Sequence, residues 1–146
     1  MFPSLRESNT LSHLAREGSE VGQIDVERLM SEIVDAGLKV HRALGPSLLE
    51  SAYERCLAYE FEMRGIPARR QVGLPIVYEG ARLDEGYRLD LVVGSAVIIE
   101  IKAVGELTRL HEAQILTYLK LSGYRLGFLM NFNVALFKHG LRRMAL

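Results

Sequence analysis

Residues 96–102, with the sequence Ala-Val-Ile-Ile-Glu-Ile-Lys, constrain the fold more than any other segment. Their apolar, β-branched character favours a β-strand, in which successive side chains point to opposite faces. Glu100 and Lys102 therefore share one face with Ile98, whereas the opposite face is wholly apolar. Central strands rarely carry ionisable groups, because desolvating an unpaired charge costs several kcal/mol. The segment predicts a strand whose charged groups need partners of opposite charge.

A preceding strand, residues 83–93, brings a further carboxylate to the same place. The short Gly-Ser turn at residues 94–95 folds the two strands into an antiparallel hairpin, so Asp90 becomes a near neighbour of Glu100 and Lys102. Two carboxylates supply the hard oxygen ligands that Mg²⁺ or Mn²⁺ accepts, and Lys102 could orient a water or stabilise phosphate charge. An ion pair between Lys102 and either carboxylate, on a solvated sheet face, explains the spacing equally well.

The remaining periodicity predicts a mixed α/β fold. Apolar residues recur at helical spacing in three segments, 25–44, 48–64 and 108–121. Asp25 is the expected N-cap of the first helix, and Ser47 with Glu50 forms the expected capping box of the second. The predicted strands are 71–78, 83–93, 96–102 and 124–132, with shorter candidates at 134–138 and, at a sheet edge, 141–145. This order, α-α-β-β-β-α-β-β, predicts a mixed central sheet flanked by helices, with the charged hairpin at its centre.

Length and composition fit one domain. The chain has 146 residues, of which 49% are hydrophobic, and its 18 acidic side chains balance 18 Lys and Arg. Residues 1–24 show no sustained apolar period and are expected to form a flexible arm, which leaves residues 25–146 as the folded domain. Balanced charge gives no general attraction to nucleic acid, so only a local basic patch could supply it. The candidates for this patch, for which a solvated surface is the alternative, are Arg69, Arg70, Lys120, Arg125, Arg142 and Arg143.

Sequence features also bear on location and assembly. No apolar run is long enough to cross a bilayer, and the first residues lack the features of a signal peptide. Cys56 is the only cysteine, so an internal disulfide or a Cys-rich metal site is excluded, which favours a cytoplasmic location. An edge strand at 141–145 could pair with a second copy, so a homo-oligomer is left open.

Two helices carry further polar candidates. Gln114 and Tyr118, spaced i and i+4, share one face of helix 108–121 and suit substrate positioning, although an amphipathic helix with Tyr118 in the core gives the same pattern. Glu50 could serve as a third metal carboxylate if its turn lies over the charged sheet face, whereas capping alone also explains it. Tyr53, one turn later, would then line the same cleft or pack beneath it.

Five motifs together resemble one family: Leu-Leu-Glu-Ser-Ala-Tyr at 48–53, Tyr-Arg-Leu-Asp-Leu at 87–91, Glu-Ile-Lys-Ala-Val at 100–104, His-Glu-Ala-Gln with Tyr-Leu-Lys-Leu at 111–121, and Gly-Phe-Leu-Met-Asn-Phe at 127–132. They resemble the GxxExxY proteins of the PD-(D/E)XK nuclease superfamily, whose restriction-endonuclease-like core has the order αβββαβ. Two residues depart from the family pattern. Ser47 replaces the Gly of the family name and is expected to cap the helix equally well, and Leu89 replaces the Pro of the superfamily name.

The resemblance implies a metal site and a reaction. Glu50, Asp90 and Glu100 would be ligands of one or two Mg²⁺ or Mn²⁺ ions, with the backbone carbonyl of Ile101 as a further ligand. Lys102 would lie beside the attacking water, so Asp90, Glu100 and Lys102 would be the catalytic residues.

The resemblance also implies a substrate. Gln114 and Tyr118 resemble a Gln-x-x-x-Tyr helix motif of the exonuclease-like branch and are expected, with Tyr53, to contact the substrate. The implied function is a metal-dependent nuclease that hydrolyses phosphodiester bonds of DNA or RNA. The alternative is a catalytically silent nuclease fold that binds nucleic acid or a protein partner.

Overall fold

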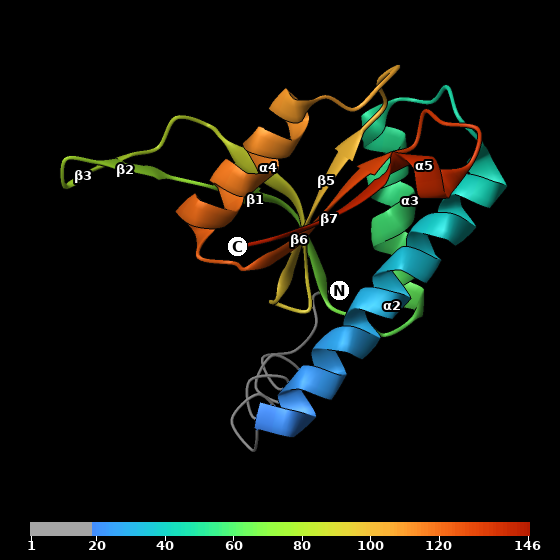
Figure 1. Cartoon of the computed structure of the whole chain (residues 1–146), viewed down its shortest axis with the longest axis horizontal. Helices are drawn as coiled ribbons and strands as arrows, with labels where there is room; N and C mark the ends of the chain where they lie inside the picture. The colour runs from blue at the N-terminus through green and yellow to red at the C-terminus, as the bar shows by residue number, and fades with distance from the viewer. Residues whose placement is uncertain (1–18) are drawn as a thin grey trace.

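The computed structural model describes residues 19–146, with side chains described from residue 25 onward, so residues 1–18 of the expected arm lie outside the described residues. Figure 1 shows a sheet flanked by helices, from which one hairpin projects. The elements are α2 (Ser19–Leu44), α3 (Glu50–Met63), β1 (Ala68–Gly73), β2 (Ile76–Tyr78), β3 (Ala81–Leu83), β4 (Arg88–Val93), β5 (Val97–Lys102), α4 (Arg109–Ser122), β6 (Leu126–Asn131), α5 (Phe137–Gly140) and β7 (Leu141–Ala145). The predicted mixed α/β architecture is confirmed and is consistent with a restriction-endonuclease-like fold.

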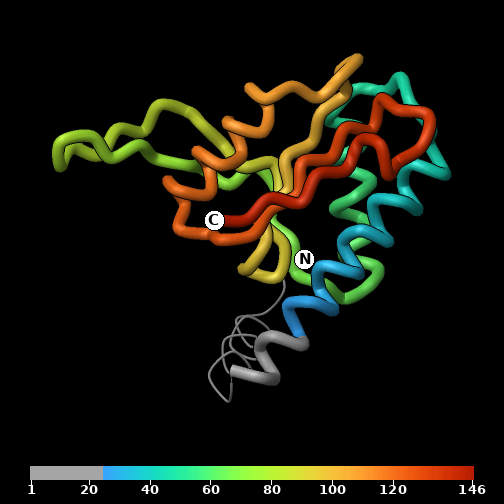
Figure 2. Tube along the Cα trace, in the orientation of Figure 1, coloured from blue at the N-terminus to red at the C-terminus, as the bar shows by residue number. Residues whose placement is uncertain are grey.

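The main sheet has the strand order β1-β4-β5-β6-β7, so β5 lies at its centre. Strand β5 pairs antiparallel with β4 and parallel with β6, while the edge strands β1 and β7 pair antiparallel with their neighbours. Helix α4 provides the crossover that the parallel pair β5 and β6 requires. The trace in Figure 2 shows the separate β2–β3 hairpin extending away from this sheet. The hairpin of β4 and β5 thus occupies the centre of the sheet, as predicted.

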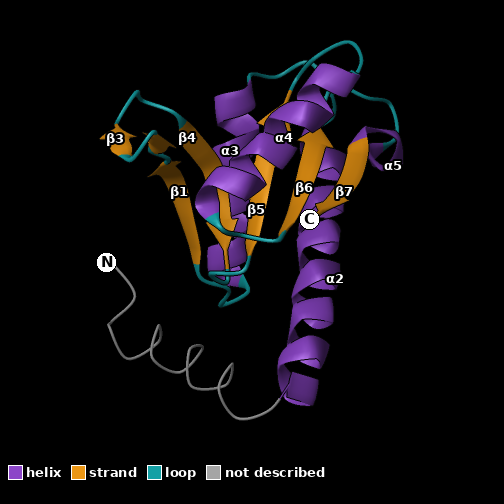
Figure 3. Cartoon of the chain, turned by 60° about the vertical axis from the view of Figure 1, so that its left-hand side comes forward, coloured by secondary structure: helices purple, strands orange, loops and turns teal. Residues whose placement is uncertain are grey.

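Apolar side chains cover both faces of the sheet, which explains why its central strands are almost continuously hydrophobic. Helices α2, α3 and α5 pack on one face and α4 on the other, as Figure 3 shows for α4. The first core contains Tyr53, Leu57 and Phe61 of α3, and the second contains Ile115 and Leu119 of α4. Fully burying each such side chain contributes about 1.5–3 kcal/mol. These two cores fix the sheet face of each strand residue, and so decide which strand residues can reach the polar side chains of α3 and which can reach those of α4.

The start of each N-terminal helix differs from prediction. Helix α2 begins at Ser19, so Asp25 lies inside the helix and the predicted N-cap is wrong. Helix α3 begins at Glu50, and its N-cap Leu49 makes no side-chain hydrogen bond, so the expected capping box is wrong as well. Ser47 has a φ of +80° in the preceding turn. Because this left-handed conformation favours glycine, Ser47 does not replace glycine without cost, contrary to expectation.

Most of the strand predictions were correct in place but not always in extent. The predicted strand 71–78 is divided, because Pro75, which lacks a backbone N–H, separates β1 from β2. The predicted strand 83–93 is also divided, because the chain turns back through β3 before β4 begins. The predicted strand at 134–138 is wrong, since α5 begins at Phe137. Helix α4 and the edge strand β7 are confirmed. No helix in the described part of the chain is long and apolar enough to cross a membrane.

Candidate active site

Asp90 and Glu100 meet where the two central strands separate. Strands β4 and β5 pair only through Leu91, Val92 and Val93 of β4. Beyond this ladder, Oδ2 of Asp90 accepts a hydrogen bond of 2.8 Å from the backbone N–H of Ile101. The backbone N–H of Asp90 donates in turn to Oε1 of Glu100 at 3.2 Å. The carboxylates that alternation placed near each other therefore do lie together, beside the opening between β4 and β5.

Burial and mutual repulsion perturb this carboxylate pair. Glu100 is 5% exposed. Its burial, and then the charge of Asp90, raise the pKa of Glu100 to about 8. Burial also raises the pKa of Asp90, and the nearby carboxylate of Glu54 adds to this effect. Protonated Glu100 is close enough to donate a hydrogen bond to Asp90. The pair therefore retains a proton at neutral pH unless a cation compensates its charge.

Lys102 does not neutralise the pair through an ion pair. Its Nζ donates to Oε1 of Gln114 at 2.9 Å, and Nε2 of Gln114 donates to the hydroxyl of Tyr118 at 3.2 Å. Among the side chains of residues 25–146, no ion pair within 4.0 Å includes Lys102, so the alternative of a structural ion pair is wrong. Helix α4 thus holds an ammonium group through a neutral amide, next to the acidic pair.

Tyr118 lies within electrostatic range of the same pair. Burial, followed by the charges of Glu100 and Asp90, raises the pKa of the Tyr118 hydroxyl above its ordinary value. The hydroxyl therefore stays protonated at neutral pH and can donate a hydrogen bond. Gln114 and Tyr118 lie on one helix face, as their i and i+4 spacing predicted, and Gln114 links this face to Lys102 of β5.

Glu50 lies apart from the pair. Its side chain is exposed, and its Oε1 accepts from the backbone N–H of Ala103 at 3.2 Å. In an extended chain the N–H groups of Ile101 and Ala103, two residues apart, point to the same edge and lie about 7 Å from each other. Asp90 accepts from the first of these N–H groups and Glu50 accepts from the second. In the described residues, no group of three or more His, Cys, Asp or Glu is placed to hold a metal ion. The structure thus gathers two of the three expected carboxylates.

The residues at the strand opening fit a hard divalent cation. Asp90 and Glu100 contribute carboxylate oxygens, the donors that Mg²⁺ and Mn²⁺ prefer. Their pKa values stay raised although the charge of Lys102 lowers both, so the ammonium group offsets the charge of the pair only in part. Two carboxylates alone do not complete the coordination of such an ion, so further oxygen ligands are needed. Of the ligands implied by the sequence resemblance, the Ile101 carbonyl and Glu50 are the remaining candidates.

Tyr53 does not line this site. Its side chain is fully buried, and its ring stacks on Phe132 with centroids 4.6 Å apart. Its hydroxyl donates to the carbonyl of Gly45 at 2.6 Å and accepts from the N–H of Leu48 at 3.1 Å. The expected substrate contact by Tyr53 is therefore corrected to a structural role, because both the ring and the hydroxyl are fully occupied in holding the turn before α3.

Sequence reasoning missed two side chains that join this polar region. Glu54 of α3 is 5% exposed and accepts from Nε2 of Gln71 at 2.7 Å. Arg70 also contacts Glu54, at 3.4 Å. Glu54 lies one helical turn after Glu50, so its i+4 spacing was an available signal. Gln71 gave none, because its position depends on an irregular backbone in β1.

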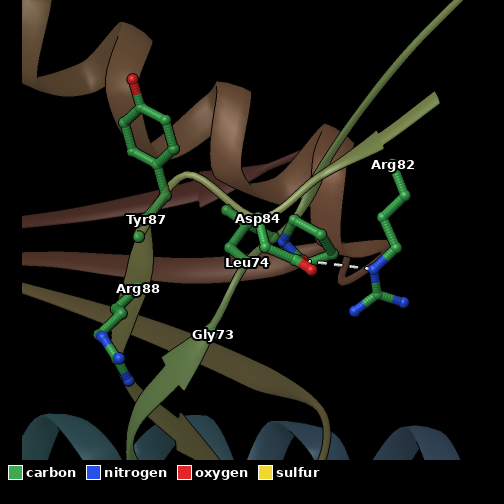
Figure 4. Close-up of a pocket in the computed structure, with 8 residues that line it drawn as sticks. Gly73, Leu74, Arg82, Asp84, Tyr87 and Arg88 are labelled. Carbon is green, nitrogen blue, oxygen red and sulfur yellow. Dashed lines mark hydrogen bonds and ion pairs between the residues drawn. The ribbon is translucent and has the colours of Figure 1, made fainter.

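A pocket of about 250 Å³ lies at the base of the β2–β3 hairpin, beside the strand that carries Asp90. Figure 4 shows Tyr87 and Arg88 at its wall, with Arg82 paired to Asp84 on the other side. Nη1 of Arg88 donates to the backbone carbonyl of Gln71 at 3.3 Å. The sequence reasoning did not single out this pocket, which places a tyrosine and a guanidinium group at the start of the strand that carries Asp90.

Three of the six candidate cations for a phosphate-binding patch have carboxylate partners. Arg70 binds Glu54, and the pairs in the C-terminal strand are Arg142 with Glu112 at 3.8 Å and Arg143 with Glu27 at 3.2 Å. The two pairs in the C-terminal strand are exposed and so contribute little stability each, about 0–1 kcal/mol. Half of the expected patch is thus engaged within the chain.

Comparison with known proteins identifies a superfamily for this chain. The profile of the PD-(D/E)XK nuclease superfamily matches residues 27–144, which include every element from α3 to α5 and most of α2 and β7. Comparisons with curated proteins and with solved structures gave no match. Since the match covers most of the chain, the chain belongs to the PD-(D/E)XK nuclease superfamily.

Proposed function

We propose that this chain is a metal-dependent nuclease that hydrolyses phosphodiester bonds of nucleic acid, with Asp90, Glu100 and Lys102 as its catalytic residues. The observation that carries the proposal is the pair of half-buried Asp90 and buried Glu100 at the opening of β4 and β5, with the ammonium group of Lys102 held beside it by α4. Membership of the nuclease superfamily supports a nucleic acid as the substrate.

Asp90, Glu100 and the Ile101 carbonyl would hold a divalent ion, Mg²⁺ or Mn²⁺, and Glu50 would complete the set only after leaving the Ala103 N–H. When bound, the ion supplies Lewis acidity for the phosphate and lowers the pKa of a water molecule. Both carboxylates must be ionised to serve as ligands, so the proton retained by Glu100 has to leave.

Lys102, Gln114 and Tyr118 act on the other side of the carboxylates. The Lys102 ammonium has three donors, of which the Gln114 amide uses one, so others are free for the attacking water or a phosphate oxygen. Gln114 orients this ammonium, and the protonated Tyr118 hydroxyl can donate to a phosphate oxygen. This arrangement stabilises charge that develops on the phosphate during hydrolysis.

The finer family assignment is part of the proposal. The motif residues Glu50 and Tyr53 in α3 support placing the chain among the GxxExxY proteins. The single free thiol of Cys56 supports a cytoplasmic location. Strand β7 pairs with β6 on one side only, so its outer edge is open for pairing with a second copy.

One observation favours a second candidate function. Because Glu50 is not gathered with Asp90 and Glu100, the metal site has fewer carboxylates than the family motifs imply. A catalytically silent nuclease fold that binds nucleic acid or a protein partner would tolerate this arrangement. The two candidates differ in metal dependence, because only a nuclease site gains thermal stability from Mg²⁺ or Mn²⁺ by mass action.

A cleavage assay tests the proposal. Labelled single- and double-stranded DNA and RNA are incubated with Mg²⁺, Mn²⁺ or EDTA and with wild type, Lys102→Ala or Lys138→Ala. Lys138 is an exposed lysine on α5 and serves as the matched control. We expect metal-dependent cleavage that Lys102→Ala abolishes and Lys138→Ala retains. Cleavage in EDTA, or equal cleavage by Lys102→Ala, would refute the proposed mechanism, and no cleavage of any substrate would favour the silent alternative.

A further inference from the structure

Gln71 has an unusual backbone conformation beside the carboxylate pair. Its φ is +52°, a region that non-glycine residues rarely occupy, although it lies within strand β1. The ladder between β1 and β4 pairs Arg70 with Leu91 and Val72 with Leu89 but omits Gln71 and Asp90, which face each other between these pairs. A strained residue of this kind persists only where surrounding contacts hold it, and such residues cluster at functional sites.

The irregular backbone places the Gln71 amide between two carboxylates. Nε2 of Gln71 lies 2.7 Å from Oε1 of Glu54 and 3.5 Å from Oδ1 of Asp90. A primary amide has two N–H donors, so one nitrogen can serve both acceptors. The guanidinium of Arg88 donates to the Gln71 carbonyl and holds the backbone from the other side. The contact with Glu54 is the stronger one and anchors the amide.

Both oxygens of Asp90 are therefore held from different strands. Oδ1 faces the Gln71 amide of β1, and Oδ2 accepts from the Ile101 N–H of β5 at 2.8 Å. Glu54, which anchors Gln71, is itself buried and paired with Arg70. The two contacts together fix the plane of the Asp90 carboxylate next to Glu100.

We propose that Gln71, anchored by Glu54, is a positioning residue that orients Asp90 toward Glu100. The chemical purpose of this orientation rests on the proposed function, in which Asp90 is a metal ligand. Residues that hold a ligand in place are typically worth about 10–100-fold in metal affinity. Gln71 acts through Asp90 and need not touch the metal or the substrate itself.

The variant Gln71→Gly separates positioning from a structural role. Glycine adopts a φ of +52° without strain, which offsets the lost hydrogen bond to the buried Glu54, so the variant should melt near the wild-type temperature. It also lacks the amide, so Asp90 is free to rotate. We expect Mn²⁺ affinity, measured by calorimetry, to fall about tenfold or more. In the metal-free protein we expect an upfield shift of the Ile101 amide proton, whose bond to Asp90 weakens, with little change at Ile99.

Two further variants complete the test. Glu54→Gln removes the anchoring charge and should weaken Mn²⁺ binding and shift the Ile101 amide in the same direction. Glu62→Gln, an exposed residue on the same helix, should change neither. Unchanged Mn²⁺ affinity together with an unchanged Ile101 amide in Gln71→Gly would overturn the proposal, as would a lowered melting temperature with shifts spread along β5. If wild type binds no Mn²⁺ but Gln71→Gly still shifts the Ile101 amide, the positioning of Asp90 stands and the proposed function fails.

Discussion

Glu100 is expected to make the metal-free protein less stable as pH rises. Its ordinary pKa is 4.5, and burial with the neighbouring Asp90 raises it to about 8 in the folded state. Below pH 4.5 both states are protonated, so the contribution is fully present there. Between these two values the unfolded chain has released the proton that the folded chain keeps, and the free energy of unfolding falls by about 1.4 kcal/mol per pH unit. Between pH 5 and pH 7 the loss is about 2–3 kcal/mol, and the raised pKa of Asp90 acts in the same direction.

Urea unfolding followed by circular dichroism in EDTA, at pH 5, 6 and 7, measures this effect. Wild type is compared with Glu100→Gln, which cannot titrate, and with Glu106→Gln, an exposed control in the loop after β5. Glu100→Gln should gain stability relative to wild type as pH rises, whereas Glu106→Gln should follow wild type. A constant difference between wild type and Glu100→Gln across the three pH values would refute the assignment of a raised pKa to Glu100.

The turn before α3 gives two further predictions. Ser47→Gly should raise the free energy of unfolding by about 1 kcal/mol, because glycine relieves the φ of +80°, and a lower melting temperature would contradict the strain. Tyr53→Phe should lower stability by about 1–3 kcal/mol in chemical denaturation, because two backbone groups of the turn lose their hydroxyl partner. An unchanged midpoint for Tyr53→Phe would show that solvent replaces the hydroxyl.

Local periodicity was sufficient to predict the centre of the site. A strand has a period of two, so the shared face of Glu100 and Lys102 followed from residue spacing, and recognising the hairpin placed Asp90 near them. Likewise, the i and i+4 spacing of Gln114 and Tyr118 placed both on one helix face, and the structure joins them to Lys102. Residue spacing did not predict the hydrogen-bond partner of Lys102, because the Gln114 amide, on a helix distant in sequence, competes for its ammonium group with the carboxylates of the same sheet.

Other parts of the site depend on contacts between distant segments. Ser47 with Glu50 matched a capping box, but the hydroxyl of Tyr53 holds the turn in another conformation and Glu50 binds the Ala103 N–H instead. Gln71 reaches Glu54 only because its backbone leaves the regular strand conformation. Such positive-φ residues carry no periodic signal, which is why neither the turn nor the anchoring of Asp90 could be predicted.

Titration calorimetry with Mn²⁺ at pH 7, in two buffers of different ionisation enthalpy, tests the central claim that Asp90 and Glu100 form a metal site. Because the pair retains a proton near neutral pH, binding should release close to one proton per wild-type molecule. Asp90→Asn and Glu100→Gln should lose measurable affinity, whereas Lys102→Ala should retain it. Absence of Mn²⁺ binding to wild type would contradict the account. So would Asp90→Asn and Glu100→Gln variants that bind Mn²⁺ with the same affinity as wild type.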